Sequence, residues 1–261
     1  MSEVWASGDA YEPYVGRWSR LVAADFLRWI DSPGSGRWVD VGCGTGAVTA
    51  AVLQLGSPDL VVGVDPSPGY VAYARRHIVE PRAGFAVAAG TALPFGDGDV
   101  DVVISGLVLN FVPEPSHAVA EMARVVRRGG TVGAYVWDYA GEMQLMRLFW
   151  DAAGELDPRA RELDEGVRFP LCRPEPLAAM FEAADLTDVR VRPIDVVTRF
   201  RDFDDYWAPF LGGQAPAPGY AMSLTEERRA ALRERIRAGL PYAADGSITL
   251  VARAWAVRGR R

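Results

Sequence analysis

The feature that most constrains the fold is an apolar segment that runs directly into a glycine-rich turn. Residues 37–46 read Arg-Trp-Val-Asp-Val-Gly-Cys-Gly-Thr-Gly. Gly42, Gly44 and Gly46 can adopt positive φ, and because they lack a Cβ they let a ligand approach the main chain closely. The segment therefore predicts a strand followed by a turn that cradles a small molecule.

The next segments predict a helix and a second buried strand. Residues 47–55 combine apolar helical spacing with strong helix formers, and Gly56 with Pro58 ends them. Residues 60–64 are continuously apolar and rich in β-branched side chains, as is typical of a parallel strand that is covered on both faces. Asp65 follows directly. This order of strand, turn, helix and strand predicts an α/β fold.

Two carboxylates indicate which ligand the turn holds. An acidic residue about 20 positions after a glycine-rich turn, at the tip of the next parallel strand, can bind a ribose diol, and Asp65 has that position. A dinucleotide site has the pattern G-x-G-x-x-G, which leaves room for a pyrophosphate. This chain has G-x-G-x-G preceded by Asp40, whose carboxylate would repel a phosphate. We therefore expect a cationic nucleoside ligand.

The turn and the strand before Asp65 belong to the first two of five motifs that follow one another within residues 10–140. In this order they resemble the class I S-adenosylmethionine-dependent methyltransferases, in particular the small-molecule branch similar to the ubiquinone and menaquinone methyltransferases. The segments are 39–46, 61–67, 93–103, 105–113 and 121–130. The resemblance implies a Rossmann-like methyltransferase fold with a doubly wound, seven-stranded, mostly parallel sheet, an antiparallel last strand and helical cap insertions.

The resemblance also implies S-adenosylmethionine as the cofactor. The family usually has an acidic residue four positions before the leucine of the Leu-Pro-Phe motif, where it accepts a hydrogen bond from the adenine amino group, but here that position is Ala89. We therefore expect main-chain groups of residues 90–93 to recognise adenine. The cofactor-binding residues that we predict are Tyr14, Arg17, Asp40, Gly42, Cys43, Gly44, Gly46, Asp65, Pro66, Ser67, Thr91, Ala92, Leu93, Ser105 and Leu107.

An aromatic segment precedes the first predicted helix, residues 21–30. In similar methyltransferases this region folds over the cofactor. That implies a lid formed by Tyr14, Arg17 and Trp18, with Arg17 near the methionine carboxylate. The alternative is that Tyr14 and Trp18 only pack the helix against the sheet. The sequence leaves both interpretations open.

The alternation of strand and helix changes after residue 138. We predict one structural domain with four regions: a lid segment and helix (1–36), an S-adenosylmethionine-binding core (37–138), a helical cap insertion (139–188), and the last strands (189–261) with a second helical insertion (201–240). Pro193 predicts that the strand at 189–200 lies at an edge or bends. Ser223 and Glu226 have the spacing of a capping box, and residues 247–257 predict the last strand.

Aromatic side chains are concentrated in the two insertions. Open α/β sheets bind ligands beyond the carboxyl ends of their strands, where a substrate cap would lie. The alternative is that these side chains form the core of the insertions, which is the commoner role of an aromatic stripe. The substrate-binding residues that we predict are Trp18, Asn110, Trp137, Phe169, Tyr206, Trp207 and Phe210, with Phe203 in the same pocket wall.

Three residues are candidates for catalysis. Methyl transfer from a sulfonium is an in-line displacement, so the protein chiefly has to hold the acceptor about 3 Å from the methyl carbon, although a phenol would also need a base. Asn110, the only asparagine, ends the predicted fourth strand, where the resemblance implies the cofactor sulfur; its alternative is a turn residue. His117 and Asp138 are candidate bases, with a solvated surface position and helix capping as their alternatives.

The composition excludes several kinds of chemistry. All 28 basic residues are arginine, so Schiff-base catalysis is excluded. The two cysteines and two histidines do not have zinc-site spacing, and we predict no metal. A formal net charge of −6 argues against a nucleic-acid partner. We find neither a long apolar segment nor a signal-peptide pattern, so we expect a cytoplasmic protein without membrane insertion.

The sequence thus predicts a methyltransferase that transfers a methyl group to an O, N or C atom of a small, mostly apolar or aromatic molecule, as a monomer or homodimer. Three alternatives stay open. A protein or RNA methyltransferase is disfavoured by the acidic composition. A non-catalytic nucleoside-binding regulator would bind the cofactor without consuming it. A nicotinamide enzyme would bind NAD instead.

Overall fold

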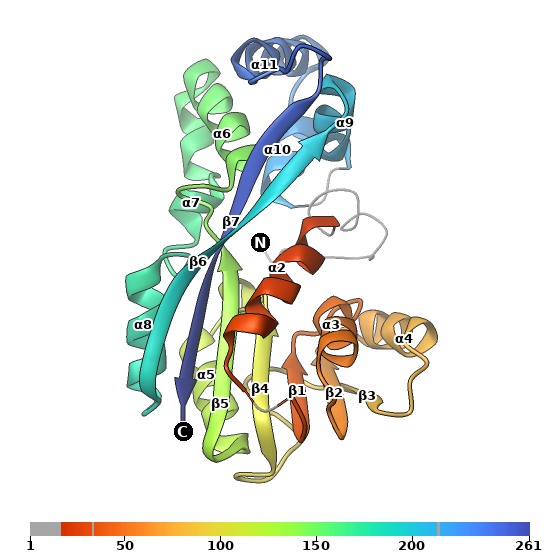
Figure 1. Ribbon diagram of the computed structural model, residues 1–261. Helices are drawn as coiled ribbons and strands as arrows, with labels where there is room; N and C mark the ends of the chain where they lie inside the picture. Colours follow the sequence, from red (N-terminus) through yellow and green to blue (C-terminus); the bar gives the residue numbers. More distant parts are fainter. Residues whose placement is uncertain (1–16, 33, 213–214) are drawn as a thin grey trace. The chain divides into compact units, whose positions relative to one another are not determined.

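The computed structural model describes residues 17–32, 34–212 and 215–261 (Figure 1). The chain forms two compact units. The first, called here the sheet unit, comprises residues 19–136, 171–194 and 254–261. The second, called here the aromatic unit, comprises residues 1–18, 137–170 and 195–253. Tyr14 and the side chain of Arg17 lie outside the described residues, so the lid contacts expected of them stay predictions.

The strands form one seven-stranded sheet in the order β3-β2-β1-β4-β5-β7-β6. The pairs from β3 to β5 are parallel, and β7 runs in the opposite direction to its neighbours (Figure 1). The predicted fold class is therefore confirmed, and β6, which contains Pro193, lies at an edge. The strands are β1 (Arg37–Val41), β2 (Leu60–Asp65), β3 (Ala83–Val87), β4 (Val100–Gly106), β5 (Val126–Trp137), β6 (Thr187–Phe200) and β7 (Ile248–Arg260).

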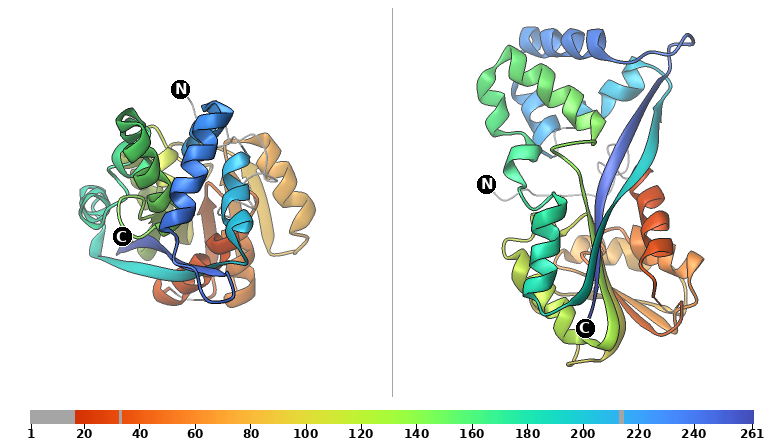
Figure 2. Two further views of the ribbon diagram at one scale, coloured as in Figure 1. Left: turned by 90° about the horizontal axis from the view of Figure 1, so that it is seen from above. Right: turned by 60° about the vertical axis from the view of Figure 1, so that its left-hand side comes forward.

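Helices cover both faces of the sheet in the sheet unit. Three helices, α2, α3 and α4, lie on one face, and α5 and α8 lie on the other (Figures 1 and 2). Their bounds are α2 (Arg17–Trp29), α3 (Ala47–Leu55), α4 (Pro68–His77), α5 (Pro115–Val125) and α8 (Pro174–Ala183). A short 3₁₀ helix, η2 (Leu109–Phe111), follows β4.

Close packing of α2 against the sheet depends on a glycine. Phe26 and Ile30 are fully buried, and a Cβ added at Gly133 of β5 would lie 2.7 Å from Ile30 Cδ1. The Phe26 ring also packs against the ring of Tyr135, with 4.9 Å between centroids. Burial of each such side chain contributes roughly 1.5–3 kcal/mol, so α2 is held by apolar packing.

The aromatic unit is mainly helical and has its own core. The Phe149 and Phe210 rings stack with 4.6 Å between centroids, and the Tyr206 hydroxyl donates a hydrogen bond to the Leu145 carbonyl at 3.0 Å. Phe149, Tyr206 and Phe210 are all fully buried. The helices are α6 (Gln144–Leu156), η3 (Pro158–Glu162), α7 (Glu165–Arg168), α9 (Phe203–Trp207), η4 (Ala208–Leu211), α10 (Pro216–Ser223) and α11 (Glu226–Gly239).

The start of α11 differs from the predicted capping box. Thr225 is the N-cap, and its hydroxyl accepts a hydrogen bond from the Arg228 amide at 3.4 Å. Ser223 ends α10 instead, and its hydroxyl donates to the Tyr220 carbonyl at 2.8 Å. The prediction of Ser223 as the cap is therefore wrong, because the preceding helix extends far enough to include it.

Candidate functional site

The carboxyl ends of three neighbouring strands bring the main sequence motifs together. β1 lies between β2 and β4, with Val41 level with Val64 of β2 and Asp40 level with Ile104 of β4. The chain order therefore reverses beside β1, and such a switch point is where open α/β sheets bind ligands. The glycine-rich turn, Asp65 and the segment after β4 all begin at this edge.

The three glycines of the turn have different roles. All have positive φ, at 75° for Gly42, 52° for Gly44 and 91° for Gly46. A Cβ at Gly42 would lie 2.4 Å from a methyl group of Val108, and one at Gly46 would lie 2.4 Å from Ile78. A Cβ at Gly44 would have no atom of the described residues within 4 Å. Gly42 and Gly46 thus allow close packing, whereas Gly44 borders open space.

Asp65 ties the turn to the second strand. Its Oδ2 accepts a hydrogen bond from the Gly44 amide at 3.0 Å, and its Oδ1 accepts one from the Ser67 amide at 2.8 Å. Burial raises the pKa of Asp65, and the two amide hydrogen bonds oppose that shift. Each carboxylate oxygen has a second lone pair. Asp65 can therefore hold the turn and still accept hydrogen bonds from a ligand.

Asp40 lies beneath the turn rather than at its surface. The residue has no solvent exposure, and its Oδ2 accepts a hydrogen bond from the Thr49 hydroxyl at 2.7 Å. Its Oδ1 has no hydrogen-bond partner among the described residues. Burial raises the pKa of Asp40 to about 7. Its carboxyl is therefore partly protonated at neutral pH, and direct contact with a cationic ligand stays a prediction.

The other predicted cofactor residues lie around the same edge. The Ser105 hydroxyl is buried and donates to the Val41 carbonyl at 2.9 Å, which links β4 to β1. Leu107 has a positive φ of 63°, so the chain turns sharply after β4. Burial raises the pKa of the Cys43 thiol, which is therefore uncharged. Ser67 caps α4 by accepting a hydrogen bond from the Tyr70 amide at 3.4 Å.

The three catalytic candidates have different surroundings. The Asn110 side chain, in η2 of the sheet unit, has a buried Nδ2 with no partner among the described residues. The His117 side chain is 70% exposed and lies 3.6 Å from Glu114. Asp138, in the aromatic unit, is buried and accepts hydrogen bonds from the amides of Gly141 and Glu142 at 3.0 and 2.9 Å. Of the three candidates, only Asn110 has a buried side-chain donor without a partner among the described residues. The three catalytic roles stay predictions.

Most predicted substrate residues of the aromatic unit pack against other aromatic rings. Trp18 meets the Phe200 ring edge-on at 5.3 Å, and Phe169 packs against Tyr139 at 5.6 Å. Trp137 is 2% exposed. These contacts agree with the alternative that the aromatic side chains form the core of the insertions.

Trp207 differs because it borders a hollow. This hollow has a volume of about 720 Å³ and is lined by Asp204, Trp207, Ala208, Leu211, Met222, Glu226, Arg229, Ala230 and Arg233. Within it Arg233 pairs with Asp204 at 2.8 Å, and Arg229 pairs with Glu226. The charged lining is thus neutralised in pairs, and the contact surface is mostly apolar.

Sequence reasoning missed a buried carboxyl in the aromatic unit. Glu165 is 2% exposed and accepts a hydrogen bond from the Trp150 indole. Burial raises the pKa of Glu165 to about 7. The neighbouring Asp164 pairs with Arg147. A glutamate beside another acid in a polar segment gives no sequence signal of burial, because its environment comes from residues far away in the chain.

Two negative findings apply to the described part of the chain. Residues 17–32, 34–212 and 215–261 contain no group of three or more His, Cys, Asp or Glu side chains that could hold a metal ion. Within the same ranges no helix combines the length and the apolar character that a membrane crossing would require.

Comparison with known proteins identifies the segment around the turn. Residues 39–133 match the model of a methyltransferase domain. An uncharacterized methyltransferase of Mycobacterium leprae is 36% identical over 130 residues, which cover 46% of this chain and 48% of the relative. The chain thus spans about half the length of the curated relatives that it matches first. The likeness to the family model is thus confined to residues 39–133.

Solved structures extend the likeness to nearly the whole chain. Phosphoethanolamine N-methyltransferase 2 from Haemonchus contortus, in complex with S-adenosyl-L-methionine, has a TM-score of 0.58 at 14% identity, with 92% of this chain and 52% of that chain covered. The [4+2]-cyclase SpnF has a TM-score of 0.55 at 17% identity, with 93% and 81% covered. Such low identities show the fold alone. The chain has the Rossmann-like methyltransferase fold.

Proposed function

We propose that this protein is an S-adenosylmethionine-dependent methyltransferase that acts on a small, mostly apolar or aromatic acceptor. One observation supports it most strongly: the Asp65 carboxylate is hydrogen-bonded to Gly44, the one glycine of the turn that borders open space. A ribose acceptor and an uncovered main chain thus meet at the switch point of the sheet. The match of residues 39–133 to a methyltransferase domain supports the same conclusion.

The residues at this edge fit the cofactor in chemistry and in space. Asp65 would accept hydrogen bonds from the ribose hydroxyls, and Gly44 would let the main chain approach the methionine part. S-adenosylmethionine supplies an electrophilic methyl group on a sulfonium. The buried carboxyl of Asp40 is partly protonated near pH 7, because burial raises its pKa to about 7. Asp40 therefore supports the turn by accepting a hydrogen bond from Thr49. Its attraction for a cationic ligand would add to this role.

The protein's own share in the reaction is mainly positioning. Holding an acceptor in line and close to a reactive carbon can supply much of the rate acceleration. Asn110 has a buried amide donor without a protein partner, so we assign it to orienting the acceptor or the cofactor. The carboxylate of Asp138 already accepts hydrogen bonds from the amides of Gly141 and Glu142, which supports a structural role for it. A general base is thus expected only for acceptors that must lose a proton.

Two properties support a small acceptor over a macromolecule. The net charge of −6 is unfavourable for a nucleic-acid partner. The aromatic unit contains many rings, of which Trp207 borders an apolar hollow of about 720 Å³. That volume falls in the range of sites for drug-sized molecules. Trp207 is accordingly the aromatic residue that we most expect to contact an acceptor.

Calorimetry tests the cofactor part of the proposal. We expect the wild-type protein to bind S-adenosylhomocysteine and not NAD. Asp65→Ala should weaken S-adenosylhomocysteine binding about 100-fold, because two hydrogen bonds to a charged group are lost. Asp59→Ala is the matched control, since Asp59 is an exposed acid just before the same strand. Unchanged affinity in the Asp65 variant, or binding of NAD alone, would refute the assignment.

Mass spectrometry tests the reaction itself. The protein is incubated with methyl-labelled S-adenosylmethionine and a library of phenols, quinones and heterocycles, and both labelled products and S-adenosylhomocysteine are measured. Formation of both identifies the acceptor class and the methylated atom. Binding of the cofactor with no turnover across the library, and none with protein or RNA substrates, would favour the non-catalytic regulator instead.

A further inference from the structure

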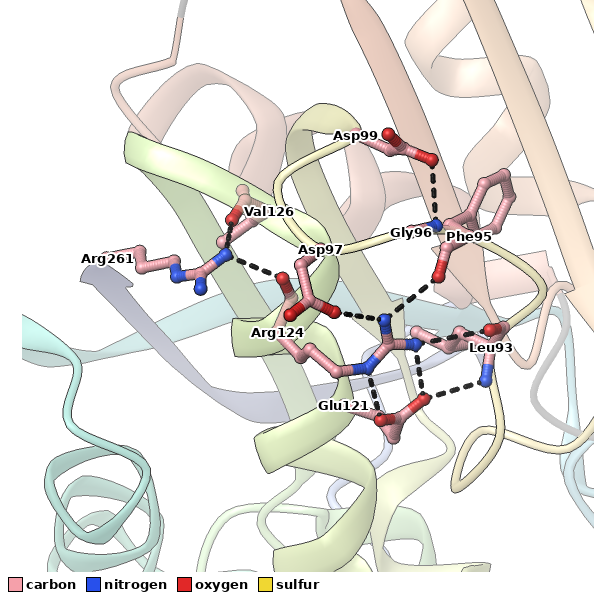
Figure 3. A network of polar contacts seen from close by, with 9 residues as sticks. All are labelled: Leu93, Phe95, Gly96, Asp97, Asp99, Glu121, Arg124, Val126 and Arg261. Atoms are coloured by element: carbon pink, nitrogen blue, oxygen red, sulfur yellow. Dashed lines mark hydrogen bonds and ion pairs between the residues drawn. The ribbon is translucent and has the colours of Figure 1, made fainter.

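A polar network connects helix α5 with the segment that follows β3 (Figure 3). Glu121 Oε2 accepts hydrogen bonds from the Leu93 amide at 3.0 Å and from Arg124 Nη2 at 2.9 Å, while its Oε1 accepts from Arg124 Nε at 2.7 Å. Arg124 Nη1 donates to the Phe95 carbonyl at 3.0 Å and to Asp97 Oδ1 at 2.8 Å. We call Glu121 and Arg124 the α5 clamp. It holds the segment at three successive points.

The clamp is itself held in place at its carboxyl end. The Arg124 carbonyl accepts a hydrogen bond from Arg261 Nη1 at 2.6 Å (Figure 3). It also accepts one from the Gly98 amide at 3.0 Å. Within the segment, Asp99 Oδ2 accepts from the Gly96 amide at 2.7 Å. Side chain and main chain of Arg124 are therefore both fixed. Arg124 thus fixes the conformation of the segment through several hydrogen bonds, whereas an isolated surface ion pair contributes little to stability.

The residues that lead from β3 to Leu93 begin beside Asp65, the predicted ribose ligand. β3 pairs in parallel with β2, and Val87 is level with Asp65. The next amide, that of Ala88, donates a hydrogen bond to the Asp65 carbonyl at 3.2 Å. Residues 89–93 therefore leave the sheet next to Asp65, on the side where a base attached to the ribose would lie.

The first residue of this segment, Ala89, has no side-chain acceptor for an adenine amino group. Ala89 has only a methyl group, so we expect main-chain groups of residues 90–93 to recognise the base. The Ala92 amide donates to the Ala89 carbonyl at 3.0 Å and closes a turn. The amide of Leu93 is already bound by Glu121. Gly90 packs tightly, since a Cβ there would lie 3.1 Å from Val41.

We propose that Glu121 and Arg124 are positioning residues that fix the carboxyl end of the 89–93 segment at Leu93, so that the main chain of this segment distinguishes adenine from other purines. The inference rests on the proposed function. Main-chain groups can discriminate between two purines only if the segment that carries them is rigid. A mobile segment can adapt its donors and acceptors to either base. The clamp thus takes over the selectivity that an acidic side chain at position 89 would provide.

Selectivity is measured as the ratio of two affinities by calorimetry. The probes are S-adenosylhomocysteine and S-inosylhomocysteine, in which an oxo group replaces the 6-amino group. We expect wild type to prefer the adenine compound, and Glu121→Gln and Arg124→Gln to reduce that preference about tenfold, as loss of a well-oriented hydrogen bond would. Arg124→Lys keeps the charge without the planar fork and should fall between. Because both affinities are measured on folded protein, lower stability alone does not change their ratio.

Arg127→Gln is the matched control. Arg127 lies three residues after Arg124 and pairs with Asp101 at 2.6 Å, outside the clamped segment. This variant should keep the wild-type ratio. Wild-type ratios in both clamp variants would overturn the positioning role and leave the proposed function intact. If wild type binds neither probe, the proposed function fails, and the inference fails with it.

Discussion

The two units of this protein hold their structure by different means. At the switch point of the sheet unit, carboxylates bind main-chain amides: Asp65 accepts from Gly44 and Ser67. In the aromatic unit, rings pack on rings, as Phe149 does on Phe210. Hydrogen bonds to the main chain fix where a ligand can lie, whereas ring packing fixes only a volume. In the sheet unit, hydrogen bonds therefore support a predicted binding role for individual residues. In the aromatic unit, aromatic content alone does not support such a prediction.

The largest expected effect is on the packing of the aromatic unit. Phe210 is fully buried, and Phe210→Ala should lower the free energy of unfolding by about 3–5 kcal/mol, because it leaves a cavity among the rings. Leu211→Ala, at an adjacent side chain that is 46% exposed, should cost much less. Urea unfolding measures both. If Phe210→Ala left stability unchanged and weakened acceptor binding, the ring would belong to a pocket wall and the contrast between the units would fail.

The next effect separates two glycines of the turn. Gly42→Ala should lower the free energy of unfolding by about 1–3 kcal/mol, because its Cβ would overlap Val108 and its φ is positive. The Cβ of Gly44→Ala would meet no atom within 4 Å in the part of the chain that the structure describes. This variant should therefore cost less in stability, yet weaken S-adenosylhomocysteine binding. Thermal unfolding and calorimetry together measure the two effects. Equal losses of stability and of binding in both variants would show that the turn is structural throughout.

A smaller effect concerns pH, because each unit contains a buried carboxyl whose pKa is raised to about 7. Burial raises the pKa of Asp40 from 3.8 and that of Glu165 from 4.5 to about 7. Between these unfolded values and about 7 the folded chain binds more protons than the unfolded chain. The free energy of unfolding should therefore fall as pH rises toward 7 and level off above it. Asp40→Asn and Glu165→Gln should each flatten this dependence in urea unfolding. Trp150 donates to Glu165, so its fluorescence should follow the second titration only. A stability that rises with pH from 5 to 7 and does not depend on either side chain would contradict these assignments.

The smallest expected effect is at His117. Its side chain is 70% exposed and pairs with the exposed Glu114, so His117→Ala should leave both stability and turnover within about twofold of wild type. Steady-state kinetics with the acceptor found by mass spectrometry measures the outcome. A loss of turnover without a change in cofactor affinity would instead restore His117 as a base.

The sequence predicted the sheet unit in detail because its signals are local. A continuous apolar run, a glycine-rich turn and an acid after the next strand each depend on neighbours in the chain, and β1, α3 and β2 were found where they were expected. The position of Pro193 correctly predicted an edge strand. The predicted cap at Ser223 was wrong, since the end of a helix also depends on the packing of the preceding one.

The candidate site was only partly accessible to sequence reasoning. Asp65 and the glycines could be named from spacing, but the burial of Asp40 under Thr49 and that of Glu165 beside Trp150 could not. The α5 clamp lies between these cases. Its i, i+3 spacing predicts an ion pair on a helix, while its hold on Leu93, 28 residues earlier, is visible only in three dimensions.

The order of residues by itself determined the α/β class, the strand and turn that present Asp65, and the absence of any lysine chemistry. The tertiary structure decided which carboxylates are shielded from water, which glycine borders open space and which aromatic rings pack together. The physical reason is that backbone conformation follows from neighbours along the chain. Burial, pKa and free volume depend on groups that distant segments bring into contact.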